Sequence, residues 1–164
     1  MKLTVISGGQ TGADQGAVRA ARSRDVATGG RAPKGWVTEE GPAPWLAEYG
    51  LRECPEPGYP ARTRYNVLDA DALLWFGNPH SPGGRLAFRA MAECHHIPSF
   101  VVIHTSTPRD VADWLEEYVF PGEEEVSLLV AGNRESGSPG IGGRVEAFVG
   151  GVLDLLSASA GAGR

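Results

Sequence analysis

Short apolar runs alternate along the chain with longer segments of helical character. The runs at 101–103 (Val-Val-Ile) and 128–130 (Leu-Leu-Val) are apolar at successive positions, which indicates strands covered on both faces. Strands are predicted at 2–7, 26–30, the later part of 70–76, 99–104 and 125–131, and helices at 12–24, 60–69, 82–96, 108–119 and 139–157. This alternation predicts an α/β, Rossmann-like fold: an open, mostly parallel sheet with helices on both faces.

The N-terminal strand leads through a glycine-containing turn into a helix. Thr11 stands at the expected N-cap and Asp14 follows three positions later, so a capping box is predicted. The segment 31–60 is rich in Gly and Pro and is predicted to be irregular; long loops of this kind are often functional. No repeat is visible, so we expect one Rossmann-like nucleotide- or phosphate-ligand-binding domain over 1–157, with 158–164 as a frayed tail.

Composition narrows the classes of partner. The 164 residues carry 15 Lys and Arg against 20 Asp and Glu, a net charge of −5, which disfavours nucleic acid. There is no run of 18 apolar residues and no signal-peptide pattern, so we expect no membrane association and a cytoplasmic location. Cys54 and Cys94 make neither a disulfide framework nor a zinc pattern, and His95 and His96 point in different directions on a helix, so no metal site is expected.

Three loops follow strands at the edge where the carboxyl ends of parallel strands meet, and open sheets bind ligands there. The first loop, 7–14, has glycines that allow close backbone approach, and amides at a helix start that attract an anion. It is neither a Walker loop nor a G-x-G-x-x-G fingerprint, and a plain strand-to-helix turn is the alternative. A carboxylate would repel a phosphate, so Asp14 is expected to face a ribose hydroxyl, an amine or a metal, or only to cap the helix.

The other two loops have similar positions. The second, 77–85, opens a helix at Pro82-Gly83-Gly84. It would add a second anion-binding site, which suits a diphosphate or a nucleotide. A long turn with Pro at the helix start is the alternative. The third, 131–140, is polar, and its Arg134 and Glu135 either contact ligand or pair with each other on the surface.

Further candidates lie outside these loops. Of the 15 basic residues 13 are Arg, so a single Arg is weak evidence for an anion site, whereas Lys34 between Pro and Gly counts for more; a solvated surface lysine is the alternative. Arg62 and Asn66 share one face of a predicted helix, either solvated or lining the crevice. The predicted ligand-binding residues are Gly8, Gly9, Gln10, Thr11, Gly12, Asp14, Lys34, Arg62, Asn66, Gly83, Gly84, Arg85, Gly132, Arg134, Glu135 and Ser136. The acid–base candidates are Asp14, Glu135 and His104.

Taken in order, several motifs resemble those of the putative molybdenum carrier family. They are Ile6 to Asp14, Ala32-Pro33-Lys34-Gly35, Arg62-Thr63 with Asn66-Val67, Asp69 to Ala72, Gly83-Gly84, and Ala131-Gly132 with Arg134-Glu135-Ser136, Pro139 to Ile141 and Arg144-Val145. The resemblance covers about residues 4–150 and implies a Rossmann-like fold related to molybdenum cofactor carriers and lysine-decarboxylase-like proteins. It also implies nucleotide or phosphorylated ligands at the glycine loops, and homo-oligomers.

The related phosphoribohydrolases carry a P-G-G-x-G-T-x-x-E motif with a catalytic Glu. Here Arg85 follows Gly84 and no such Glu is present, so hydrolase activity is not carried over from the resemblance. Any molybdenum would come inside a cofactor held by its phosphate.

Three functions therefore stay open. The first is a binding or carrier protein for a phosphorylated small molecule, such as a nucleotide or a molybdenum-pterin-type cofactor. The second is a nucleotide or nucleoside-phosphate hydrolase that uses an Asp or Glu as acid–base. The third is a ligand-sensing regulatory domain, with the segment 31–60 as its moving part.

Overall fold

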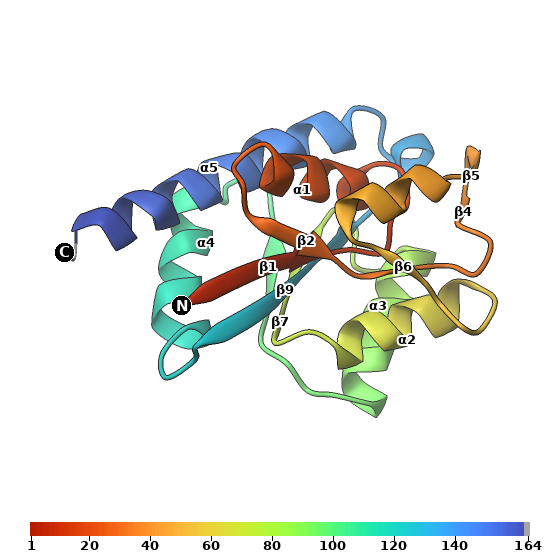
Figure 1. Cartoon of the computed structure of the whole chain (residues 1–164), viewed down its shortest axis with the longest axis horizontal. Coiled ribbons are helices and arrows are strands. Elements are labelled where there is room, and N and C mark those ends of the chain that lie inside the picture. Colours follow the sequence, from red (N-terminus) through yellow and green to blue (C-terminus); the bar gives the residue numbers. More distant parts are fainter. Residues whose placement is uncertain (163–164) are drawn as a thin grey trace.

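The structure, a computed structural model that describes residues 1–162, has a five-stranded parallel sheet at its centre (Figure 1). The spatial order of the strands is β2-β1-β9-β7-β8, and every neighbouring pair is parallel. The strands are β1 (Lys2–Ile6), β2 (Ala27–Gly29), β7 (Ala72–Phe76), β8 (Ser99–Val102) and β9 (Glu125–Gly132). The predicted open α/β, Rossmann-like fold is therefore confirmed.

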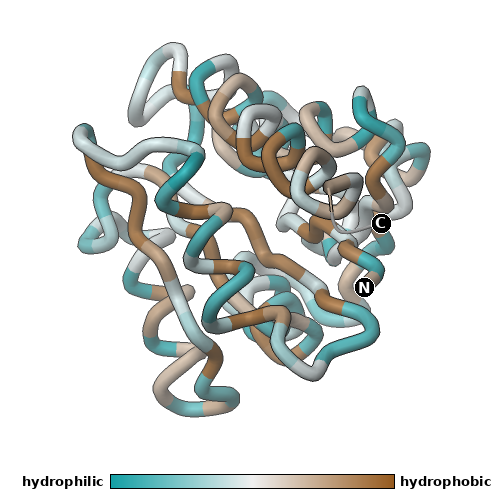
Figure 2. The backbone as a smooth tube through the Cα atoms, turned by 90° about the vertical axis from the view of Figure 1, so that its left-hand side faces the viewer, coloured by the Kyte–Doolittle hydropathy of each residue, from teal (hydrophilic) through white to brown (hydrophobic). Residues whose placement is uncertain are grey.

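Helices cover both faces of the sheet, which explains why the strands are apolar at successive positions. In β7, Leu74 belongs to the cluster shared with α1, α4 and α5, whereas its neighbour Leu73 belongs to the cluster shared with α2 and α3. Figure 2 shows the apolar strand segments running through the middle of the molecule. The helices are α1 (Ala13–Arg22), α2 (Tyr59–Leu68), α3 (Pro82–Glu93), α4 (Pro108–Trp114), continued by a π-helical turn at Leu115–Val119, and α5 (Ile141–Ala162).

The segment 31–60 is more ordered than its Gly and Pro content predicts. It contains two short strand pairs and a 3-10 helix, and Leu46 and Leu51 are buried against Val18 of α1. Burial of these leucines fixes the segment on the body of the protein, which a reading of turn residues alone could not foresee. The elements are β3 (Arg31–Ala32) with β6 (Arg52–Glu53), β4 (Val37–Thr38) with β5 (Gly41–Pro42), and the 3-10 helix Pro44–Tyr49.

The predicted capping box at the start of α1 is wrong. Gly12, with φ of 81°, occupies the N-cap, and no side chain caps the helix. Thr11 Oγ1 donates to the Glu39 carboxylate, and Asp14 Oδ2 accepts from the Gln10 amide at 3.2 Å. A distant carboxylate and a neighbouring loop amide thus satisfy the groups that the capping box would have paired.

The C-terminal helix is longer than predicted. α5 runs to Ala162, so the expected frayed tail is helical over 158–162, where three of the five residues are alanine, the best helix former; positions 163–164 lie outside the described residues. By length and composition α5 could span a membrane, a test that core helices of soluble proteins also pass. Here its Val145, Val149 and Leu153 are buried in the core with α1 and α4. The domain assignment for 1–157 stays a prediction.

Candidate functional site

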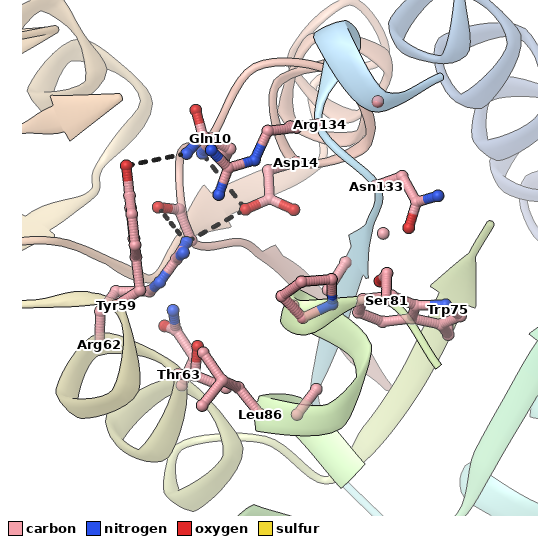
Figure 3. Close-up of a pocket in the computed structure, with 18 of the residues that line it drawn as sticks. Gln10, Asp14, Tyr59, Arg62, Thr63, Trp75, Ser81, Leu86, Asn133 and Arg134 are labelled. Carbon is pink, nitrogen blue, oxygen red and sulfur yellow. Dashed lines mark hydrogen bonds and ion pairs between the residues drawn. The ribbon is translucent and has the colours of Figure 1, made fainter. Parts of the chain in front are cut away.

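A cavity of about 770 Å³ opens at the carboxyl edge of the sheet, where the three candidate loops were expected to meet (Figure 3). Its walls come from the loops after β1, β7 and β9, from the last residues of β7 and β9, and from α1, α2 and α3. Its volume lies in the range typical of small-molecule sites. The described residues that line it are Gly8, Gln10, Asp14, Tyr59, Arg62, Thr63, Asn66, Trp75, Asn78, His80, Ser81, Pro82, Gly83, Leu86, Ala87, Leu129, Ala131, Gly132, Asn133, Arg134 and Gly137.

A buried ion pair dominates one wall of this cavity. Arg62 Nη1 lies 3.3 Å from Asp14 Oδ2 and donates to the Gly8 carbonyl at 2.7 Å. The two charged side chains retain only 11% and 7% of their exposure. Burial raises the pKa of Asp14, against the lowering effects of the Arg62 charge and the Gln10 amide. Burial lowers the pKa of Arg62, but a guanidinium titrates so high that Arg62 keeps its charge.

Two guanidinium groups lie against the ring of Tyr59 on the same wall. The Arg62 and Arg134 Cζ atoms lie 5.4 Å and 5.5 Å from the centroid of its ring. Its hydroxyl is 3.3 Å from Gln10 Nε2, which donates to it. Figure 3 shows this cluster on one side of the cavity, with side chains from three segments: Gln10 and Asp14, Tyr59 and Arg62, and Arg134. Cation–π stacking of this kind holds the exposed Arg134 over the cavity.

The opposite wall combines apolar surface with the start of a helix. Trp75, Leu86 and Ala87 give it an apolar lining, and Ser81 caps α3 by accepting from the Gly84 amide at 3.2 Å. Gly83 lies in the first turn of α3 and lines the cavity, and within residues 1–162 its amide donates no hydrogen bond. The positive end of a helix dipole therefore borders the cavity.

Three amides of the first glycine loop are paired within the loop and are not available to bind an anion. The amide of Gly9 donates to Ser7 Oγ, that of Gln10 to Asp14, and that of Thr11 to Gln10 Oε1. Three consecutive amides are thus used within the loop, and the sequence-based expectation that they would face the ligand is wrong. The positive charge at the cavity comes from arginine side chains and the start of α3 instead.

Half of the predicted ligand-binding set lines the cavity. These residues are Gly8, Gln10, Asp14, Arg62, Asn66, Gly83, Gly132 and Arg134. Thr11, Gly12 and Glu135 instead border a separate pocket of about 170 Å³. The lining of the large cavity does not include Gly9, Lys34, Gly84, Arg85 or Ser136.

The residues outside the cavity have other contacts. A Cβ on Gly9 would lie 2.7 Å from Leu46 Cδ1, so Gly9 is needed for packing, and one on Gly84 would lie 2.2 Å from the Pro79 carbonyl. Lys34 is exposed, and Arg85 Nε donates to the His80 carbonyl.

Glu39, at the turn of the β4–β5 hairpin, joins that hairpin to two of the candidate loops. Its carboxylate accepts from the hydroxyls of Thr11 and Ser136 and from the Ser136 amide at 3.0 Å, and its own amide donates to Gln10 Oε1 at 2.9 Å. Burial raises the pKa of Glu39, but the Ser136 and Thr11 bonds and the Arg134 charge outweigh it, so the pKa is lowered. Ser136 therefore has a structural partner in place of the predicted ligand.

Of the three acid–base candidates, only Asp14 lines the cavity. Glu135 accepts from the amides of Gly140 and Gly142 at the start of α5, and these bonds lower its pKa. His104 is exposed in the turn after β8. The geometry thus leaves Asp14 as the carboxyl group that could exchange a proton with a molecule in the cavity.

Several lining residues were not predicted as ligand-binding. Asn78, His80 and Ser81 lie in the second loop and Asn133 in the third, so their loops were recognised but the individual side chains were not. Tyr59 was not predicted, because its second stacking partner, Arg134, is 75 residues away and no local pattern brings the two together. No group of three or more His, Cys, Asp or Glu within residues 1–162 could hold a metal ion.

Fold and cavity together define an α/β protein with a small-molecule-sized site at the carboxyl edge of a parallel sheet. A family model described as the circularly permutated YpsA SLOG family matches residues 5–153, and the chain belongs to this family. The solved structure of a putative molybdenum carrier protein from Syntrophus aciditrophicus SB is similar, with a TM-score of 0.75 and 29% identity over 93% of each chain. No curated protein matches the chain. The resemblance to the putative molybdenum carrier family is thereby confirmed.

Proposed function

We propose that the protein binds or carries a phosphorylated small molecule, a nucleotide or a molybdenum-pterin-type cofactor, in the cavity at the carboxyl edge of the sheet. The observation that carries the proposal is that the exposed Arg134 and the start of α3 border one cavity, beside the paired Arg62 and Asp14. A carrier role fits the putative molybdenum carrier protein whose structure is similar.

The charges around the cavity favour an anion at its α3 side. Arg62 and Asp14 are paired, so their contributions nearly cancel, while Arg134 is exposed and has no carboxylate within ion-pair distance in the described part of the chain. The free Gly83 amide at the positive end of α3 adds a donor. We infer that the phosphate lies near Gly83, with Arg134 as a second contact.

The apolar lining supports a ring in the same molecule. Trp75, Leu86 and Leu129 offer contact area that a phosphate alone would not use. A nucleobase or a pterin has the flat apolar faces that such a wall packs against. Since no metal-ligand cluster exists within residues 1–162, molybdenum would be bound only as part of its cofactor.

Substitution of Gly83 by Asp tests the position of the phosphate. A Cβ at Gly83 meets nothing closer than Trp75 Cη2 at 3.9 Å, and a carboxylate in the first turn of a helix is stabilising. Two unit charges about 6 Å apart interact by roughly 3 kcal/mol at an effective dielectric constant near 20. We expect Gly83→Asp to fold normally and to bind nucleoside 5′-monophosphates or a pterin phosphate at least about tenfold more weakly.

Gly83→Asn is the matched control, because it has the same shape without the charge. Isothermal titration of both variants and the wild type measures the effect. Equal affinity of the Asp and Asn variants would place the phosphate elsewhere, and failure of the folded wild type to bind any of these compounds would contradict the proposal.

One observation favours hydrolysis as the second candidate. Asp14 lines the cavity, and burial raises the pKa of its carboxyl group, as in carboxyl groups that act as general acids. Release of base or ribose phosphate from nucleoside monophosphates, lost in Asp14→Asn, would support a nucleotide hydrolase.

We further expect the protein to act in the cytoplasm and to form a homo-oligomer. Sedimentation of the purified chain tests the oligomeric state.

A further inference from the structure

We propose that Asp14 is a specificity-determining residue whose free carboxylate oxygen accepts a hydrogen bond from an uncharged N–H or O–H donor of the bound molecule. This inference rests on the proposed function and adds to it the chemistry that the ligand must present. It concerns the half of the carboxylate that the ion pair does not use.

The two oxygens of Asp14 have different surroundings. Oδ2 accepts from the Gln10 amide at 3.2 Å and from Arg62 Nη1 at 3.3 Å. The Gly8 amide also interacts with this carboxyl group and helps to lower its pKa. Within residues 1–162 no donor lies within 3.5 Å of Oδ1 in hydrogen-bond geometry, and Oδ1 is not one of the fully buried polar atoms without a partner, so it borders the cavity that Asp14 lines. Figure 3 shows this oxygen directed toward the open middle of the cavity.

The neighbourhood of Oδ1 selects the kind of group that can approach. Asp14 is the only acidic residue among the described residues lining the cavity, and Arg62 stands beside it, so a divalent cation would meet one carboxylate and a guanidinium. A phosphate would meet the carboxylate charge directly. An uncharged donor is compatible with both Asp14 and Arg62, because it gives Oδ1 a hydrogen bond without adding a charge to a buried site.

Two parts of a nucleotide or pterin phosphate can supply such a donor. One is a ring N–H, such as the one next to the carbonyl of guanine, uracil or a pterin. The other is a ribose hydroxyl. Both share the chemistry of an uncharged donor, and the experiment separates them.

Asp14→Asn turns the acceptor into a donor at this position. The Gln10 amide and Arg62 Nη1 both donate to the Oδ2 position, so the oxygen of the substituted side-chain amide must occupy it. The NH₂ group then replaces Oδ1 and faces the ligand donor. The shape of the side chain is almost unchanged, so the variant alters hydrogen-bond direction more than packing.

The experiment measures affinity ratios within matched ligand pairs by isothermal titration. The ring arm compares guanosine with 1-methylguanosine 5′-monophosphate, uridine with 3-methyluridine 5′-monophosphate, and 6-hydroxymethylpterin phosphate with its 3-methyl form. The ribose arm compares guanosine and uridine monophosphates with their 2′,3′-dideoxy forms. Ratios cancel the change in overall charge that Asp14→Asn causes, and the exposed Asp113→Asn serves as a matched control.

In the wild type and in Asp113→Asn we expect one arm to show a loss of about tenfold or more when the donor is removed, because an unpaired buried acceptor is costly. In Asp14→Asn that ratio should fall close to one. Two results overturn the inference but leave the proposed function standing. In the first, the wild type binds the ligands, but removal of the donor changes the affinity in neither arm. In the second, removal of the donor weakens binding to Asp14→Asn as much as it weakens binding to the wild type. Binding of none of these compounds to the folded wild type overturns both.

Discussion

Replacement of Arg62 by Met tests whether the cavity wall is held by a charged pair. The change removes the Nη1 bonds to the Gly8 carbonyl and to Asp14, and it leaves the Asp14 carboxylate buried without its counter-charge. Removing one partner of a buried pair costs about 3–5 kcal/mol, a large share of the ~5–15 kcal/mol that stabilises a typical domain. The same change at Arg64 should cost less than about 1 kcal/mol, because its pair with Glu56 is exposed.

The loss in Arg62→Met should depend on pH. The folded-state pKa of Asp14 is already raised above its unfolded value of 3.8, and without Arg62 it rises further. A group with a raised folded-state pKa favours folding when protonated, so the destabilisation should be smallest below about pH 3.8 and grow as pH rises through the folded-state pKa. The double variant Arg62→Met/Asp14→Asn should regain much of the loss at neutral pH.

Urea unfolding of the wild type, Arg62→Met, Arg64→Met and the double variant at several pH values measures these differences. If Arg62→Met loses the same free energy at every pH, or if the double variant is no more stable than the single one, Asp14 is not a buried charge that Arg62 compensates. Both results would refute the electrostatic description of this wall.

Two further changes test contacts around the site. Gly16→Ala should destabilise the protein by about 1–3 kcal/mol despite the better helix propensity of alanine, because the new Cβ would lie 2.3 Å from the Gly142 carbonyl of α5. Thermal unfolding measures the change. Gly143→Ala is the control and should be neutral or stabilising, because its Cβ would meet nothing within 4 Å. Glu39→Gln should reduce stability above about pH 4.5, and its difference from the wild type should shrink as pH falls through the lowered folded-state pKa; a difference that grows in acid would contradict the assigned bonds to Ser136.

The sequence was sufficient for the fold because the fold depends on a regular pattern. Strands that are apolar at successive positions require cover on both faces, and Leu73 and Leu74 do pack on opposite faces. The edge that holds the cavity follows from the same argument, since the carboxyl ends of parallel strands share one edge. Arg62 and Asp14 were each predicted as site residues on local grounds.

The pairing within the site could not be predicted in the same way. The Arg62–Asp14 contact joins residues 48 positions apart, and the stack on Tyr59 brings in Arg134 from a third segment. The amides of the glycine loop were expected to face a ligand, but Gln10 Oε1 and Asp14 lie close enough to accept from them. Such local competition for backbone amides depends on side-chain positions that no spacing rule specifies.

The most direct test of the account is a ¹H–¹⁵N titration of the full chain with the nucleoside 5′-monophosphates and the pterin phosphate, which reports where a ligand binds even when binding is weak. We expect the largest shifts at the Gly83 amide and the Trp75 indole N–H, with the Gly143 amide unchanged. Shifts centred on the exposed Lys34 segment, or none at any ligand concentration, would contradict a phosphorylated ligand in this cavity.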